Sequence, residues 1–210
     1  MNTTITALIA AASCTAAASA GIAFTVDFDD RPIGPSTYAA AGPEQILDYA
    51  GGQIQFSGGV ILGFPTAFPA VDFATEPNVY ASSSTGDPSL SDTLAIDIDL
   101  GGAGASLVQG LLFNGETQAN DFIVTAYDLA GAVVDSAMYN IPSNLDSGAA
   151  IFSLSSDMDN IYRVEFQEYN TDGAWNMLLD TITFNREIPA PGSILSIAGL
   201  GLIASRRRRA

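Results

Sequence analysis

The feature that most constrains this chain is the alternation of apolar and polar residues in many short segments. From Leu94 to Leu100 every second residue is leucine or isoleucine, and two of the residues between them are aspartates. Side chains in a β-strand point alternately to opposite faces, so this period of two predicts strands with one buried face. The predicted strands are residues 23–29, 51–56, 60–64, 94–100, 107–113, 122–127, 132–139, 150–154, 161–168 and 178–184.

Helical patterns are weak by comparison. Residues 43–49 are expected to form one or two helical turns, and the proline-containing stretch 66–91 is expected to be loop. About nine to eleven strands with turn signals between them, and no visible internal repeat, predict an antiparallel β-sandwich. Jelly-roll topology is the expected form at this length.

The N-terminus has the pattern of a signal peptide. Residues 1–20 carry no charged side chain and end in Ala18-Ser19-Ala20, the small-x-small motif of a signal-peptidase site. We expect a signal helix that is cleaved after Ala20, with lipidation at Cys14 as an alternative. Cys14 is the only cysteine, so the mature chain would contain no disulfide. Residues 21–187 then have the length of one domain.

The C-terminal residues 188–210 combine a proline-bracketed turn, an apolar stretch and a basic end. The residues that define this pattern are Pro189, Ala190, Pro191, Arg206, Arg207, Arg208 and Arg209. The arrangement resembles the PEP-CTERM sorting tail of exported bacterial proteins, although Ala190 stands where that family most often has glutamate.

The resemblance implies recognition and processing by an exosortase-type enzyme, export, and delivery to the cell surface or extracellular matrix. The apolar stretch from 193 to 205 is shorter than the roughly 20 residues of a permanent transmembrane helix. We therefore expect a short apolar helix that stops transiently in the inner membrane, with a permanent anchor as the alternative.

The charge of the predicted domain excludes one class of partner. The chain has 23 acidic residues and seven arginines, with no lysine and no histidine. Four of the arginines belong to the tail, which leaves Arg31, Arg163 and Arg186 in the domain. So acidic a surface repels phosphates, and a nucleic-acid partner is excluded. The same charge would attract divalent cations.

The residue types also limit the chemistry. Without histidine there is no Ser-His-Asp machinery and no imidazole zinc site, and without lysine there is no phosphate-binding Gly-Lys motif. Carboxylates, amides and hydroxyls remain, which suit calcium, sugar hydroxyls or a paired-carboxylate glycosidase. No spacing marks a glycosidase. We expect a protein without catalytic activity that binds or structures extracellular polysaccharide, with a carboxylate-dependent glycan-processing enzyme as the alternative.

A second resemblance favours the same function. The strand pattern over 122–139, 161–168 and 178–184 is similar to the jelly-roll modules often carried by PEP-CTERM exoproteins. Those modules are similar in shape to carbohydrate-binding domains. The resemblance therefore implies binding of a glycan by the domain.

One carboxylate group is predicted from strand parity. Asp30 shares parity with Phe28 at the end of the first strand, and Asp180 shares parity with Ile182 at the start of the last. If these strands pair antiparallel, Asp30 and Asp180 converge inside the domain, with Asp29 nearby. Buried carboxylates need compensation. A calcium ion bound by the three aspartates would supply it, and arginine or backbone N–H partners are the alternative.

The remaining candidates are less specific. Asp97 and Asp99 lie on the polar face of their strand, where solvation is the simplest interpretation. Asp157 and Asp159 lie in an oxygen-rich loop without the spacing of an EF-hand. Trp175, in the segment Thr-Asp-Gly-Ala-Trp, is the best candidate for stacking against a sugar, with core packing as the alternative.

Overall fold

The computed structural model describes residues 20–32, 45–63, 78–82, 93–115, 117–146, 148–169 and 177–188. These ranges contain twelve strands and one short 3-10 helix, Asn144–Asp146, and none of their helices could span a membrane. The strands are β1 (Ala20–Val26), β2 (Leu47–Tyr49), β3 (Ile54–Ser57), β4 (Gly59–Gly63), β5 (Asn78–Ser82), β6 (Thr93–Ile98), β7 (Leu107–Asn114), β8 (Asn120–Tyr127), β9 (Val133–Ile141), β10 (Ala149–Ser155), β11 (Arg163–Glu168) and β12 (Met177–Ile188).

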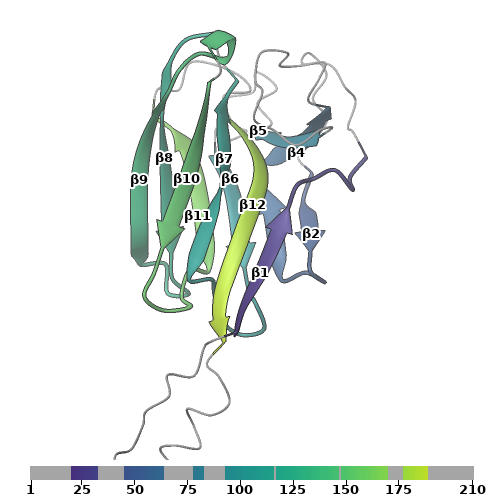
Figure 1. The fold of residues 1–210 in the computed structure, drawn as a ribbon, viewed down its shortest axis with the longest axis vertical. Coiled ribbons are helices and arrows are strands. Elements are labelled where there is room, and N and C mark those ends of the chain that lie inside the picture. Colours follow the sequence, from purple (N-terminus) through teal and green to yellow (C-terminus); the bar gives the residue numbers. More distant parts are fainter. Residues whose placement is uncertain are drawn as a thin grey trace, which may run out of the picture. The chain divides into compact units, whose positions relative to one another are not determined.

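The strands form two six-stranded sheets (Figure 1). The first sheet has the order β10-β7-β12-β5-β4, with β1 paired to β12, and the second has the order β2-β3-β6-β11-β8-β9. From β5 onward the orders 10-7-12-5 and 9-8-11-6 are those of a jelly roll, in which most connections cross between the sheets. The predicted antiparallel β-sandwich is therefore confirmed.

The main core lies between the two sheets and is rich in aromatic rings. The ring of Phe56 lies 5.1 Å from that of Phe28, 5.7 Å from that of Tyr49 and 5.7 Å from that of Tyr80. All three contacts are edge-to-face, an arrangement that contributes about 0.5–1.5 kcal/mol beyond the area buried. Farther along the sandwich, Phe152 and Phe166 meet edge-to-face at 5.0 Å.

A second apolar cluster lies on the other face of the first sheet. It consists of Val60, Leu62, Val79, Ala81, Phe113 and Leu178. Their neighbours in sequence, such as Ile61, Tyr80 and Leu179, belong to the main core. Because side chains alternate along a strand, this part of the first sheet is buried on both faces. The outward face of the second sheet is instead polar and partly exposed.

Two strands were not predicted. β5 lies in the stretch 66–91 that was expected to be loop, and β2 lies where helical turns were expected at 43–49. All five residues of β5 are buried, so apolar residues do not alternate with polar ones, and β2 has only three residues. A period of two cannot be recognised in either case. The described ranges therefore contain twelve strands where about nine to eleven were expected for the chain.

The first strand ends earlier than predicted. Phe28 has a φ of 63° and the backbone N–H of Arg31 donates to its carbonyl at 3.0 Å, so the chain turns after Val26. Phe28 still points into the core, where it is fully buried. Asp30, however, is carried to the surface, where its side chain is 65% exposed. The prediction that Asp30 faces inward is wrong.

A bulge in β12 changes the orientation of Asp180. Thr181 has a φ of 47°, and the register with β7 shifts between Asp180 and Thr183. As a result Leu179 and Ile182 both face the main core although they are three residues apart. Asp180 pairs with Leu111, which packs on the second apolar cluster, so Asp180 is buried on that face instead. The prediction that Asp180 faces the same side as Ile182 is wrong, because the strand is not regular between them.

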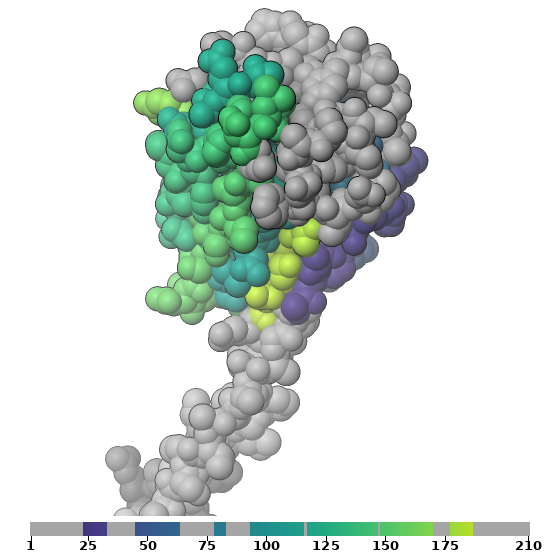
Figure 2. Space-filling model, turned by 45° about the horizontal axis from the view of Figure 1, so that its top comes forward, coloured from purple at the N-terminus to yellow at the C-terminus, as the bar shows by residue number. Residues whose placement is uncertain are grey.

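The terminal strands pair as expected. β1 and β12 lie side by side (Figures 1 and 2) and run in opposite directions, as the arrows of Figure 1 show, and the hydroxyls of Thr25 and Thr183 are 3.0 Å apart. Residues Gly21–Glu187 form one compact unit. The signal helix, Cys14 and the C-terminal apolar helix lie outside the described residues, so the limits of the signal peptide and tail stay predictions.

Candidate ligand-binding face

One row of side chains crosses the entire outward face of the second sheet. Directly paired residues of neighbouring strands project from the same face, about 5 Å apart. The strand register makes this row continuous, and its members are Asp48, Gln55, Asp97, Arg163, Tyr127 and Val133. With five spacings of about 4.8 Å, the row is roughly 24 Å long. We call these six residues the row.

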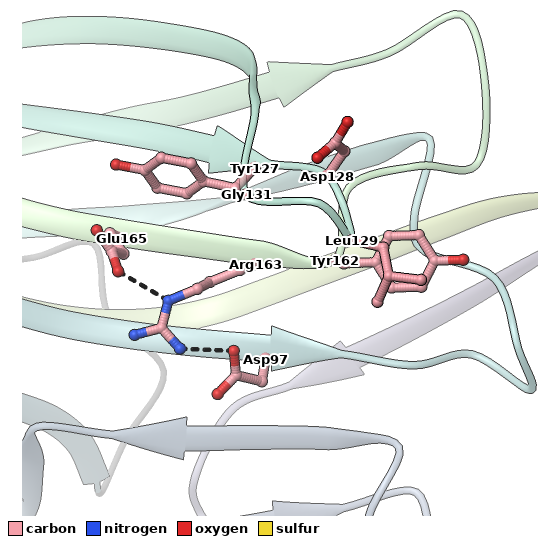
Figure 3. A pocket seen from close by; sticks show the side chains of 8 residues that line it. All are labelled: Asp97, Tyr127, Asp128, Leu129, Gly131, Tyr162, Arg163 and Glu165. Carbon is pink, nitrogen blue, oxygen red and sulfur yellow. Dashed lines mark hydrogen bonds and ion pairs between the residues drawn. The ribbon is translucent and has the colours of Figure 1, made fainter.

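Hydrogen bonds fix the polar members of the row. The amide of Gln55 donates to the carboxylate of Asp48 at 2.9 Å. Arg163 donates through Nη1 to Asp97 and through Nε to Glu165, each at 2.7 Å (Figure 3). Glu165 lies two residues beyond Arg163 on β11 and therefore projects from the same face. The guanidinium is thus held between two carboxylates.

The protonation states of Arg163 and Tyr127 follow from this arrangement. Partial burial lowers the pKa of Arg163, but its hydrogen bonds to Glu165 and Asp97 and their charges outweigh that effect and raise it overall. Burial, and then the Glu165 carboxylate, raise the pKa of Tyr127. Arg163 therefore stays charged and Tyr127 stays a neutral hydroxyl at physiological pH.

Two adjacent hollows lie along the row. The first has a volume of 450 Å³ and lies over Arg163, Glu165 and Tyr127 (Figure 3). The second has a volume of 420 Å³ and extends towards Gln55. Asp97, Leu129 and Tyr162 line both hollows, so they form the boundary that the two share. Together the hollows make a shallow depression on this face.

Local structure at the edge of the depression positions its apolar residues. Leu129 belongs to the turn between β8 and β9, where Asp128 accepts hydrogen bonds from the N–H groups of Ala130 at 2.9 Å and Ala132 at 2.8 Å. Gly131 supplies the φ of 81° that this turn requires. The Tyr162 hydroxyl donates to the carbonyl of Gly102 at 3.3 Å. A fixed aromatic ring and an exposed leucine thus border a polar surface.

This arrangement suits an uncharged ligand rich in hydroxyls. After its two hydrogen bonds Arg163 has three further N–H groups, because a guanidinium carries five. Asp97 and Glu165 each bond to Arg163 through one oxygen, so donors and acceptors alternate over a few ångströms. An aromatic ring beside a small set of fixed polar groups is typical of a small-molecule site.

The predicted calcium ligands occupy three different environments. Asp29 accepts a hydrogen bond from the N–H of Asn78 at 3.1 Å, and burial raises its pKa despite that bond. Asp30 forms an exposed ion pair with Arg31 at 3.3 Å. Asp180 is fully buried. Across the part of the chain that the structure describes, no three acidic side chains are grouped to hold a metal ion, and calcium stays a prediction.

Other predicted site residues lie beyond the described ranges. Trp175, Ala18 and the sorting residues Pro189, Ala190, Pro191, Arg206, Arg207, Arg208 and Arg209 are among them. Ala20 is the first residue of β1. The roles assigned to these residues stay predictions.

Three other aspartates are engaged in specific contacts. Asp97 was expected to be only solvated, but it pairs with Arg163 in the row. The carboxylate of Asp99 accepts a hydrogen bond from the N–H of Gly102 at 2.6 Å. Asp159 lies 3.7 Å from the Nε of Arg186.

The residues at the centre of the depression were not predicted from the sequence. Arg163 and Glu165 alternate with the buried Val164 and Phe166, so the strand pattern already placed them on one outward face. Their approach to Asp97 depends on the pairing of β6 with β11, which are separated by four other strands in sequence. Sequence alone gives no sign of that pairing.

No family model and no curated protein matches this chain. Its fold is similar to that of a DUF4465 family protein from Bacteroides caccae ATCC 43185, with 14% identity and a TM-score of 0.48 over 87% of this chain and 99% of that one. The K2 cleaved adhesin domain of Lys-gingipain has 18% identity and a TM-score of 0.44, over 77% and 97% of the two chains. A family 29 carbohydrate-binding module has 9% identity and a TM-score of 0.42, over 80% and 93%.

Proposed function

We propose that the outward face of the second sheet binds carbohydrate and that the protein acts as a binding module without catalytic activity. The observation that carries this proposal is the row: six paired positions, about 24 Å long, along which lie two hollows that share the aromatic ring of Tyr162. A surface of this length and chemistry can contact several sugar units of one chain.

The state of the carboxylates supports binding over hydrolysis. A glycosidase needs two carboxylates, one to protonate the leaving group and one to attack or to activate water. In the depression Asp97 and Glu165 both bind Arg163 at 2.7 Å. A carboxylate held in this way is oriented to accept hydrogen bonds from a ligand. The alternative function, glycan processing, is separated from binding by measuring whether sugar is released.

Affinity measurements with a matched pair of variants test the proposal. Tyr162 lines both hollows, whereas Tyr169 is 62% exposed and lines neither. Titration of the protein with a panel of soluble polysaccharides should find at least one ligand. Tyr162→Ala should weaken its binding about tenfold, equivalent to ~1.4 kcal/mol, and Tyr169→Ala should leave it unchanged. Equal loss in both variants, or release of sugar, would count against a binding module.

We further propose that the protein is exported and sorted to the cell surface or extracellular matrix, where polysaccharide is available to it. The support is the uncharged N-terminus that ends at Ala20 and the tail that resembles PEP-CTERM. An exosortase-type enzyme and the export machinery would be its partners. Neutral residues in place of Arg206 to Arg209 should prevent processing and surface retention. A variant that fractionates like the wild type would show that the tail has another role.

A further inference from the structure

The charges and hydrogen bonds of the residues that line the depression determine which class of glycan can bind there. Building on the proposed function, we infer that it selects uncharged sugars with adjacent hydroxyls and rejects acidic polysaccharides such as polymers of uronic acid. The residue that decides this is Arg163, together with the two carboxylates that bind it.

Arg163 is the only basic residue that lines either hollow among the described residues. An unpaired guanidinium there would form a bidentate pair with a uronate carboxylate. Asp97 and Glu165 already occupy two of its N–H groups at 2.7 Å and neutralise its charge. Arg163 therefore acts as a hydrogen-bond donor in the depression and not as an anion-binding site.

The charges that surround Arg163 strengthen the selection. Four acidic residues line the two hollows, namely Asp97, Asp99, Asp128 and Glu165. Against one arginine they give the lining a net charge of −3. A ligand carboxylate within a few ångströms of these charges is repelled, and because the side chains of Arg163 and Asp97 are partly exposed, dissolved salt screens that repulsion.

The same groups fit a pair of neighbouring hydroxyls. Each hydroxyl can donate to one carboxylate and accept from the guanidinium, because a hydroxyl is both donor and acceptor. The two 2.7 Å bonds fix the spacing of the protein groups before the ligand arrives. Such fixed donors and acceptors favour a ligand that forms hydrogen bonds with all of them and disfavour a ligand that leaves some of them unpaired.

The test uses pairs of oligosaccharides that differ only at C6. Glucan, galactan and mannan oligomers, each with its C6-carboxylate counterpart, are titrated into the full chain at low ionic strength. We expect the neutral member of a bound pair to bind at least tenfold more tightly. This preference should shrink in high salt, where repulsion is screened.

Two double variants separate the role of Arg163 from that of total charge. Asp97→Asn with Glu165→Gln releases Arg163 and changes the lining from −3 to −1, and we expect the preference to fall below about twofold through tighter binding of the uronate. Asp121→Asn with Asp157→Asn makes the same change in total charge outside both hollows. This control should keep the preference of the wild type.

The outcomes distinguish the two proposals. If the wild type binds neither member of any pair, the proposed function fails. If it binds glycans but takes uronates as tightly as neutral sugars, the function stands and this inference is overturned. A preference that persists at high salt or in the Arg163-releasing variant also overturns it. Melting curves show whether that variant is folded, and the salt series tests the inference on the wild type alone.

Discussion

Tyr49→Phe should remove a large part of the sensitivity of this protein to alkaline pH. Tyr49 is 9% exposed, and its ring packs edge-to-face on Phe28 and Phe56. The Arg31 guanidinium lies 4.1 Å from the ring centroid, and the hydroxyl donates to Asp30 at 3.4 Å. Burial raises the pKa of Tyr49 to about 12, although the hydrogen bond and charge of Arg31 lower it.

The loss of stability at alkaline pH follows from the different pKa of Tyr49 in the unfolded and the folded protein. In the unfolded chain the phenol ionises near its ordinary value of 10.0, whereas in the folded protein it stays neutral until about pH 12. The stabilisation is therefore complete below pH 10 and is lost as the pH rises to 12. Two pKa units correspond to about 2.7 kcal/mol, or a fall in Tm of roughly 5–10 °C for a domain of this size.

Thermal unfolding at pH 9, 10, 11 and 12 checks this prediction. The wild type should lose stability relative to Tyr49→Phe over the upper two steps, and the two proteins should unfold alike at pH 9. Tyr169→Phe, at a position that is 62% exposed, controls for the loss of a phenol. If the wild type and Tyr49→Phe lose stability in parallel up to pH 12, the burial argument for Tyr49 is wrong.

Two further predictions concern an open sheet edge and a metal ion. β10 is an edge strand of the first sheet, and the backbone N–H of Ser155 on it donates to the carboxylate of Asp135 on β9 at 2.9 Å. Asp135→Ala should therefore lower the Tm by about 2–4 °C and increase self-association through the exposed edge, which sedimentation measures. An unchanged sedimentation profile would show that Asp135 does not protect this edge from association. If Asp29, Asp30 and Asp180 bind calcium, chelation should lower the Tm by several degrees, because a ligand at a hundredfold excess over its Kd stabilises by about 2.7 kcal/mol. Coincident melts with calcium and with chelator would refute that site.

The sequence predicted most strands because one face of each is buried and the other is polar. β8 shows this clearly, with buried residues at every second position from Asn120 to Ala126. The alternation fails where both faces are buried, as in β5, and where a strand is very short, as in β2. Local patterns record the environment of each strand but not its neighbours.

The candidate site was harder to predict for a related reason. Parity placed Arg163 and Glu165 on one face, but the row exists only through the register of six strands. Parity also failed at Asp180. The bulge at Thr181 inserts one residue into β12, so the side chains before the bulge point to the face opposite the one that a regular strand would give them. Strand order and bulges are set by tertiary packing, which no local pattern shows.

The central claim is that the outward face of the second sheet holds the glycan. Backbone amide chemical shifts, followed by NMR while a bound neutral oligosaccharide is titrated, test it most directly. We expect the largest shifts to cluster at Gln55, Asp97, Tyr127, Arg163 and the turn at 128–132. Shifts that cluster instead on β10, β7 or β4 of the first sheet would contradict it.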